Sequence, residues 1–284
     1  MRLIDGRAIA AAIREDLGAA AAALIAAGTV PTLAVVVPTD DEATDWYVRS
    51  IERMAKRAGI ECRIEHMLDA SGGQLGARLA ELSLDPSVHG IICQTPMPAG
   101  VALHEVAAHI APAKDIDGAS PTSLGRLAAG LPTFAPATAA AVLEILRHEG
   151  VPLSGSRVVV VGRSTVVGKP AALLLIAAHA TVTVCHSRTV GLADVCAEAD
   201  VLVAAAGKAS LIGAGHVKPG AVVIDVGTNP TSDGGLAGDV DQEAVSRRAA
   251  VLTPVPGGVG PVTTSLLLRH AVLAAQSGLA AQSG

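Results

Sequence analysis

The sequence predicts an α/β protein of two domains, each a mostly parallel sheet flanked by helices, the C-terminal one Rossmann-like. Short aliphatic runs alternate with longer Ala- and Leu-rich stretches, a rhythm typical of parallel sheets covered by helices on both faces. The rhythm breaks at a Pro-rich loop near residue 96 and restarts near residue 150. A chain of 284 residues suffices for two modest α/β domains or one large one.

The first half of the chain contains three helical patterns, each paired with an apolar run. Gly28 and Gly59 follow two of these helices, and glycine readily takes the left-handed conformation that ends a helix. We expect helices at residues 8–27, 43–58 and 72–83, and strands at residues 33–37, 62–67 and 89–94.

The second half opens with a helix over residues 138–149 and then resumes the alternation. We expect strands at residues 158–161, 182–185, 201–204 and 221–226, and helices from about 168, over 191–198 and from about 263. The last helix can pack back on the first domain. We therefore expect one domain of residues 1–120 plus 264–284 and a second of residues 121–263.

Composition narrows the class of protein. Hydrophobic residues make up 50% of the chain and aromatic residues 1%, so the core must be aliphatic. The net charge of −5 argues against a nucleic-acid or acidic-membrane partner. The four cysteines form no C-x-x-C pair, the nine histidines form no metal-binding pattern, and the N-terminus lacks a signal peptide. We expect a metal-free, cytoplasmic protein.

A strand-turn-helix near residue 160 has the character of a dinucleotide site. Four valines, residues 158–161, lead into Gly162, and a helix follows Gly168. Glycines let the backbone turn and approach a phosphate, whose oxygens then meet free N–H groups at the helix start. Ser164 replaces the middle glycine of the usual G-x-G-x-x-G spacing, so a plain strand-to-helix turn remains an alternative.

The next strand indicates which dinucleotide binds. NAD-binding units usually end this strand in an acidic residue that binds the ribose hydroxyls, whereas this strand ends in Cys185-His186-Ser187-Arg188. Arg163 and Arg188 can pair with a 2′-phosphate. We therefore favour NADP over NAD.

Several longer motifs of the chain are similar to those of a known enzyme family. The chain resembles the bifunctional methylenetetrahydrofolate dehydrogenase/methenyltetrahydrofolate cyclohydrolase family over nearly its full length. The similar stretches are Val160–Pro170, Ala205–Lys208, Val223–Asn229, Gly238–Asp241, Thr253–Pro261 and Lys114–Gly118.

The resemblance implies an enzyme of one-carbon metabolism and a homodimer. It implies a folate substrate on the N-terminal side of a cleft between two domains, and NADP on the C-terminal side. The residues carried over to NADP are Gly162, Arg163, Ser164, Ser187 and Thr228. Those carried over to the folate are Tyr47, Gln94, Asp117, Pro256, Gly257, Gly258, Val259 and Gly260, and the first three of these are also the candidate catalytic residues.

The residue types suit these roles. The Tyr47 ring can stack on a flat pterin, Asp117 can accept hydrogen bonds from its amino group, and Gln94 ends a strand, where sites of α/β proteins lie. Each also has a structural alternative. Tyr47 can be a core or rim aromatic, Asp117 a turn or cap residue, and Lys208 and Asp225 solvated or capping residues.

One position departs from the family pattern. The family places a lysine four residues after the tyrosine, whereas this chain has Ile51. On a helix, position 51 lies about 40° around from Tyr47, on the same face. Lys56, Arg49 and Arg53 lie off that face.

The missing lysine separates the family's two reactions. Dehydrogenation moves a hydride and needs orientation more than a protein base. Hydrolysis of the methenyl product needs proton transfers, for which a tuned lysine is suited. We expect an NADP-dependent methylenetetrahydrofolate dehydrogenase with impaired cyclohydrolase activity. The alternatives are a fully bifunctional enzyme in which Lys114 or ordered water replaces the lysine, and a diverged non-catalytic paralogue that binds folate and nucleotide.

Overall fold

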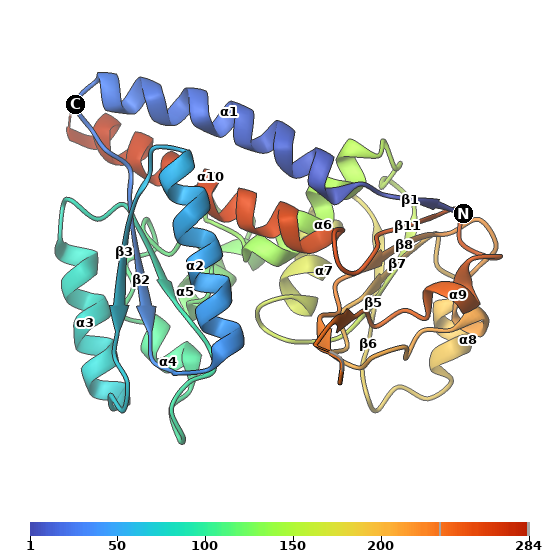
Figure 1. The fold of residues 1–284 in the computed structure, drawn as a ribbon. Coiled ribbons are helices and arrows are strands. Elements are labelled where there is room, and N and C mark those ends of the chain that lie inside the picture. The colour runs from blue at the N-terminus through green and yellow to red at the C-terminus, as the bar shows by residue number, and fades with distance from the viewer. Residues whose placement is uncertain (233, 283–284) are drawn as a thin grey trace. The chain divides into compact units, whose positions relative to one another are not determined.

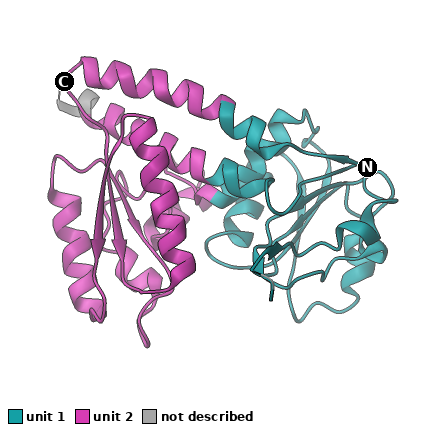
Figure 2. Cartoon of the chain, in the orientation of Figure 1, with its two compact units in different colours: residues 1–11, 138–263 teal, residues 12–137, 264–284 magenta. Residues whose placement is uncertain are grey.

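The computed structural model describes residues 1–232 and 234–282, and the chain divides into two compact units (Figure 2). Unit 1 comprises residues 1–11 and 138–263, and unit 2 comprises residues 12–137 and 264–284. Each contains a parallel sheet with helices, which confirms the predicted fold class. Two long helices, α1 (Gly6–Ala26) and α10 (Val259–Gln282), contribute residues to both units.

The units divide the chain differently from the predicted domains. Residues 1–11 belong to unit 1 because β1 (Arg2–Leu3) pairs with β11 (Val251–Leu252). Residues 121–137 belong to unit 2, where Ser120 and Ser123 hydrogen-bond to Asp115. Asp233, Ser283 and Gly284, which fall within the predicted domains, lie outside the described residues.

Unit 2 contains a three-stranded parallel sheet in the order β3-β2-β4. Its strands are β2 (Thr32–Val37), β3 (Glu61–His66) and β4 (Gly90–Cys93), and its own helices are α2 (Glu42–Arg57), α3 (Gly72–Leu84), α4 (Leu103–Ala107) and α5 (Pro121–Ala128). The central strand β2 is buried along its whole length. A continuous apolar run is what a parallel strand covered on both faces requires.

The side chains of β2 alternate between two cores, and Figure 1 shows α2 and α3 on opposite sides of this sheet. Leu33, Val35 and Val37 pack with residues of α1, α2 and α10. Ala34 and Val36 pack with residues of α3 and α4. Strand periodicity thus places helices on both faces of the sheet.

Unit 1 contains a six-stranded parallel sheet in the order β1-β11-β8-β7-β5-β6, and a two-stranded antiparallel pair. Its further strands are β5 (Arg157–Val161), β6 (Thr181–Cys185), β7 (Val201–Ala204), β8 (Val222–Asp225), β9 (Asn229–Pro230) and β10 (Leu236–Ala237). Its own helices are α6 (Ala137–His148, whose first residue falls in unit 2), α7 (Gly168–Ala177), α8 (Leu192–Cys196), the 3-10 helix η1 (Ala214–His216) and α9 (Gln242–Val245). One face of the sheet packs against α8 and α9 in an aliphatic core.

The carboxyl ends of parallel strands meet at one edge of each sheet. Gln94 follows β4 at this edge in unit 2, and Gly162 and Ser187 follow β5 and β6 at this edge in unit 1. Ligands of open α/β sheets bind at this edge, so the predicted residues lie where a site is expected.

Candidate active site

Helix α2 is anchored beside the loop that follows β4. Asp41 caps the helix by accepting a hydrogen bond of 2.8 Å from the Thr44 backbone N–H. The Thr44 hydroxyl lies 2.8 Å from the Asp41 carboxylate and 2.9 Å from the Thr95 carbonyl oxygen, so one proton serves both acceptors. Tyr47 follows one turn later, and this anchor therefore fixes its helix against the residue next to Gln94.

Tyr47 lies close to Asp117, as the predicted folate site requires. Its side chain is partly buried and packs against the core of unit 2, and its hydroxyl forms a hydrogen bond with Thr264. Burial, and to a smaller extent the negative charge of Asp117, raises the pKa of Tyr47 to about 12. The hydroxyl therefore stays protonated at neutral pH, and the residue offers an aromatic face and a neutral polar group.

The turn that carries Asp117 is fixed by its neighbour Asp115. Asp115 is fully buried and accepts hydrogen bonds from the Ala119 and Ser120 N–H groups, both at 3.0 Å, and from the Ser123 hydroxyl at 2.6 Å. Gly118 has a φ of 57°, and a Cβ there would lie 2.6 Å from the Phe134 carbonyl oxygen. The Lys114–Gly118 motif thus encodes a tight turn that needs Asp115 and glycine.

Asp117 itself is a titratable group with an unusual environment. Burial, and to a smaller extent the nearby charge of Asp115, raises the pKa of Asp117 to about 7, while the Ala137 N–H donated to its carboxylate opposes the rise. Asp117 can therefore hold or release a proton near neutral pH. The sequence predicted its place in the site but not this property.

His270 is a part of this site that the sequence did not reveal. It lies on α10 and is buried, and its Nδ1 donates to the Ile116 carbonyl at 2.8 Å, directly before Asp117. Burial lowers the pKa of His270 to about 4, so the ring is neutral. Its centroid lies 5.1 Å from that of Phe134. No motif surrounds His270, and 154 residues separate it from Ile116.

Gln94 and Ile51 complete the predicted group. Gln94 is 8% exposed, and its side-chain amide has no hydrogen-bond partner among the described residues, which leaves the amide available to a ligand. Ile51 lies one turn after Tyr47, has no exposed surface, and packs in a core cluster with Val37 and Ile116. No group that moves a proton stands at position 51.

Lys114, one of the alternatives for replacing the missing lysine, is held away from Tyr47 and Gln94. Its ammonium donates to the carbonyl oxygen of Asp85 at 2.6 Å and reaches that of Leu82 at 3.5 Å. Asp85 precedes β4, whereas Gln94 follows it. The lysine is therefore held at the opposite, amino edge of the sheet.

In unit 1, the turn between β5 and α7 depends on two glycines. Gly162 has a φ of 136°, and a Cβ there would lie 2.0 Å from the Ala205 carbonyl oxygen. A Cβ at Gly168 would lie 2.2 Å from the Gly162 carbonyl oxygen. Backbone therefore packs against backbone on both sides of the turn.

Ser164 stands in the place of the usual middle glycine and organises the turn. Its hydroxyl oxygen accepts hydrogen bonds from the N–H groups of Val167 at 3.1 Å and Gly168 at 3.3 Å. The N–H groups of residues 163–166 have no partner within the described chain, and the Arg163 side chain is exposed. Free N–H groups at a helix start beside a cation fit the phosphates of a dinucleotide.

Two buried aspartates shape the other loops at this edge. Asp225 accepts hydrogen bonds from the N–H groups of Gly227, Asp239 and Val240 at 2.9–3.0 Å. Asp239 accepts from the N–H groups of residues 206–208 at 2.6–2.9 Å and from Asn229 Nδ2 at 2.9 Å. Asp225 therefore has a structural role, and Asp239 was missed. Ser187 and Thr228 are exposed, in the loops that follow β6 and β8.

The loop Pro256–Gly260 belongs to unit 1, whereas Tyr47, Gln94 and Asp117 belong to unit 2. Gly258 packs so closely that its Cβ would lie 2.6 Å from the Pro254 carbonyl oxygen. A Cβ at Gly6 would lie 1.9 Å from the Gly258 carbonyl oxygen. Gly6 thus allows the start of α1 to approach the loop.

Two kinds of site are absent from the residues that the structure describes. These residues contain no group of three or more His, Cys, Asp or Glu side chains that could hold a metal ion. Within the same part of the chain, every helix is too short or too polar to cross a membrane.

Comparisons with known proteins find the same family over nearly the whole chain. The family model "Tetrahydrofolate dehydrogenase/cyclohydrolase, catalytic domain" matches residues 4–117, and the model "Tetrahydrofolate dehydrogenase/cyclohydrolase, NAD(P)-binding domain" matches residues 136–279. A relative called "Bifunctional protein FolD", from Parafrankia sp. (strain EAN1pec), is 59% identical over 275 residues, which cover 97% of this chain and 99% of that protein.

Two solved structures extend the likeness to three dimensions. The bifunctional methylenetetrahydrofolate dehydrogenase/cyclohydrolase from Campylobacter jejuni has a TM-score of 0.95 and 37% identity, with coverage of 98% of this chain and 99% of that one. The corresponding enzyme from Trypanosoma brucei, complexed with NADP cofactor and inhibitor, has a TM-score of 0.92 and 36% identity, with 98% of each chain covered.

Proposed function

The chain belongs to the tetrahydrofolate dehydrogenase/cyclohydrolase family, and we propose that it oxidises 5,10-methylenetetrahydrofolate to 5,10-methenyltetrahydrofolate with NADP, while its cyclohydrolase activity is impaired. The proposal that the cyclohydrolase activity is impaired rests on Ile51. It is fully buried one turn after Tyr47, on the helix face where the family has its lysine.

The dehydrogenase step makes few demands on the protein's acids and bases. A hydride leaves the methylene carbon, and the cation that remains is delocalised over the two flanking nitrogens. NADP, when bound, supplies the hydride acceptor. The protein must hold and orient the two molecules, which is worth a large part of the barrier.

The described residues can supply this binding and orientation. The free N–H groups of residues 163–166 and the Arg163 side chain suit the cofactor phosphates. The absence of an acidic residue after β6, with Ser187 and Arg188 in its place, favours the 2′-phosphate of NADP. Tyr47 offers a ring to the pterin, and Asp117 and Gln94 offer hydrogen-bonding groups.

Hydrolysis of the methenyl product demands proton transfers. A water molecule adds to the methenyl carbon and loses one proton. The resulting hydroxyl loses the other proton as the carbonyl forms, and a ring nitrogen gains one as its bond to that carbon breaks. A positioned acid-base group contributes roughly 10²–10⁴-fold to such a step. Because Ile51 has no proton to move and Lys114 is held at the other edge of the sheet, we expect this step to be slow.

A bifunctional enzyme is the second candidate, because the Parafrankia relative is named as bifunctional and one titratable group remains. Asp117 has a pKa of about 7 and lies near Tyr47, so it can exchange a proton at neutral pH. Asp117 would then do the acid-base work that the lysine does in the family.

The test uses purified protein with methylenetetrahydrofolate and NADP, followed by the absorbance of the methenyl product. We expect this absorbance to rise and then to decay no faster than in enzyme-free buffer. Decay that depends on the enzyme would support the bifunctional candidate. Binding of both ligands without turnover would select a non-catalytic paralogue. The same assay with NAD should be slower than with NADP.

We also propose that the protein is a cytoplasmic homodimer, as its family resemblance implies. Sedimentation equilibrium at micromolar concentration is expected to give the mass of two chains. A mass of one chain that does not change with concentration would contradict the proposal.

A further inference from the structure

A pocket of about 550 Å³ opens at the amino edge of the unit 2 sheet, where β2, β3 and β4 begin. Its charged and polar lining includes Glu61, Arg63, Ser87, His89 and Lys114. Tyr47, Gln94 and Asp117 do not line it, and the carboxyl-edge site does not use its residues. Its volume lies in the range of small-molecule sites.

Lys114 is a half-buried ammonium that forms no ion pair among the described residues, although the negative charge of the Asp85 carboxylate lies near it. It donates to the Asp85 carbonyl at 2.6 Å and reaches the Leu82 carbonyl at 3.5 Å. No carboxylate of the described chain lies within ion-pair distance of it. Burial lowers the pKa of Lys114, and the negative charge of Asp85 opposes this shift in part. One of its three N–H bonds is left for a further acceptor.

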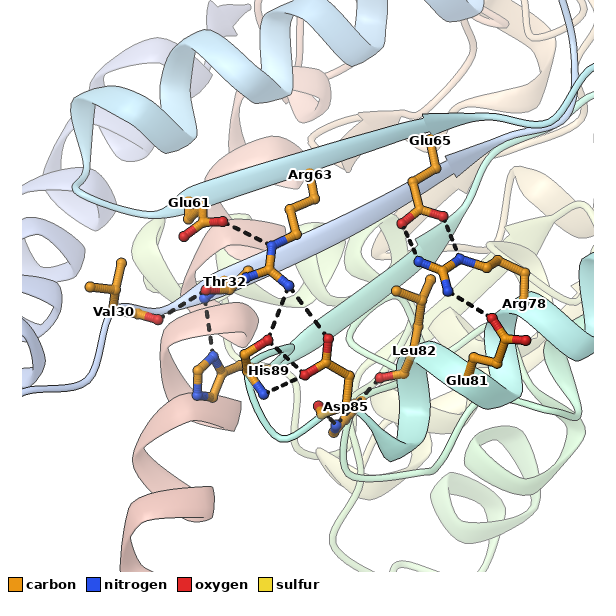
Figure 3. A network of polar contacts seen from close by, with 12 residues as sticks. Val30, Thr32, Glu61, Arg63, Glu65, Arg78, Glu81, Leu82, Asp85 and His89 are labelled. Atoms are coloured by element: carbon orange, nitrogen blue, oxygen red, sulfur yellow. Dashed lines mark hydrogen bonds and ion pairs between the residues drawn. The ribbon is translucent and has the colours of Figure 1, made fainter.

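Arg63 reaches from β3 toward the loop before β4 (Figure 3). Its Nε donates to Glu61 at 2.8 Å, and its Nη1 donates to the Ser87 hydroxyl at 3.0 Å and lies 3.5 Å from the Asp85 carboxylate. Its Nη2 has no partner among the described residues. Glu61 is thus occupied by Arg63, while part of the guanidinium fork remains free.

His89 adds a third donor, and its tautomer follows from its hydrogen bond. Its Nδ1 accepts from the Thr32 N–H at 3.1 Å (Figure 3), so the proton of the neutral ring is on Nε2. Burial and the charges of Lys114 and Arg63 lower the pKa of His89, which keeps the ring neutral. The free N–H groups of this pocket are therefore donors on an ammonium, a guanidinium and an imidazole.

We propose that this pocket binds the phosphate group of a small molecule through Lys114, Arg63 and His89. Three N–H donors, two of them cationic, match an oxyanion with several acceptor atoms. A cation finds no free carboxylate there, because Glu61 pairs with Arg63 and the Asp85 carboxylate accepts hydrogen bonds from Ser87 and faces Arg63. Part of the pocket wall is apolar and consists of Val30, Val88 and Ala274. Inorganic phosphate would leave this wall uncovered, whereas the organic group of a phosphate monoester could cover it, so a monoester fits better.

The test titrates the full chain, in the presence of saturating NADP, with inorganic phosphate and with phenyl phosphate at constant ionic strength. Backbone amide NMR shifts are expected at residues 87–89 and 113–114, with phenyl phosphate binding tighter than phosphate. NADP occupies the phosphate-binding turn after β5, and shifts confined to residues 162–168 would overturn the proposal. This map does not depend on catalysis, so a failed dehydrogenase assay leaves it readable.

Variants measure the contribution of each donor. Lys114→Met is expected to weaken phenyl phosphate binding about tenfold or more, since it removes a charge-assisted hydrogen bond. Arg63→Gln should weaken it severalfold. The matched control is Lys56→Met, which removes an exposed lysine that does not line the pocket and should leave affinity unchanged. Unchanged affinity in a folded Lys114→Met protein would overturn the proposal; if that variant does not fold, Arg63→Gln and the amide map decide.

Discussion

At the scale of single residues, the first prediction concerns Ile51, which is fully buried beside Tyr47. Ile51→Lys restores the family's residue and is expected to raise enzyme-dependent decay of methenyltetrahydrofolate. A lysine buried among apolar side chains should also lower stability, by on the order of 1–3 kcal/mol. The methenyl absorbance assay and a thermal melt measure the two effects. Ile51→Met, which adds no proton donor, should leave hydrolysis unchanged, and equal gains in both variants would contradict the argument.

The raised pKa of Asp117 leads us to expect that the stability of the folded protein depends on pH. Its pKa is raised from 3.8 to about 7 in the folded protein, so the folded chain holds this proton more tightly than the unfolded chain. The stabilising effect of the proton is therefore complete below about pH 4 and is lost as pH rises toward about 7. The amide of Asp117→Asn does not titrate, so the melting temperature of the variant relative to the natural protein should rise across this window.

His270 provides an internal check on that experiment. Its pKa is lowered to about 4, so its contribution has the opposite slope and is lost as pH falls from about 6.5. Because His270 is present in both proteins, its effect should cancel in the difference of melting temperatures. A difference that stays constant from pH 4 to pH 7 would contradict the shifted pKa of Asp117.

The residues that the sequence could predict are those that carry motifs. Tyr47, Asp117 and Gly162 stand in recognisable local patterns, and Gln94 ends an apolar run. His270, in contrast, acts through a contact between segments distant in the chain, its hydrogen bond to the Ile116 carbonyl over 154 residues. Sequence spacing contains no trace of such a contact.

At the scale of helices and strands, the third prediction concerns the turn between β5 and α7. Gly162→Ala places a Cβ about 2.0 Å from the Ala205 carbonyl oxygen at a φ of 136°. The clash and the strained backbone should cost about 2–4 kcal/mol and weaken NADP binding. Chemical denaturation and a nucleotide titration measure these effects.

Gly155→Ala is the matched control for the turn. Gly155 also has a positive φ, of 77°, but nothing lies within 4 Å of the added Cβ. It should show the cost of the backbone conformation alone, about 1 kcal/mol, with NADP affinity unchanged. An equal loss of affinity in both variants would argue against a specific role for the turn.

The longer helices and strands were predictable, whereas the two-residue strands were not. Helix α1 (Gly6–Ala26) and strand β2 (Thr32–Val37) end within two residues of their predicted limits. The two-residue strands β1 and β11 have no periodicity, and they exist because distant segments pair. Helix α5 has a signal that was overlooked, because Ser120 caps it and Pro121 occupies its first position.

Helix α10 shows how a local rule can mislead. We expected it to begin at about Thr263, because Gly260 and Pro261 favour a loop, yet it begins at Val259. Proline is tolerated in the first turn of a helix, where its missing N–H has no intrahelical partner. The motif Pro256–Gly260 is therefore part loop and part helix.

At the scale of the whole molecule, two units with separate aliphatic cores share the chain (Figure 2). The predicted domain limits, which followed the order of the sequence, differ from these units at residues 1–11 and 121–137. Pairing of β1 with β11 and the hydrogen bonds of Asp115 decide these segments instead. Domain limits depend on such long-range contacts, which a single sequence does not display.

The two units allow the ligand assignments to be tested separately by amide hydrogen exchange. NADP should give its greatest protection at residues 163–166 of unit 1, whose N–H groups lack partners in the described chain. A tetrahydrofolate derivative should give its greatest protection in unit 2, at the loop after Gln94 and the first turn of α2. Exchange reports local opening, so a ligand that binds these groups must slow it there. Protection of residues 94–98 by NADP alone, with no change at residues 163–166, would reverse the assignment of cofactor and substrate.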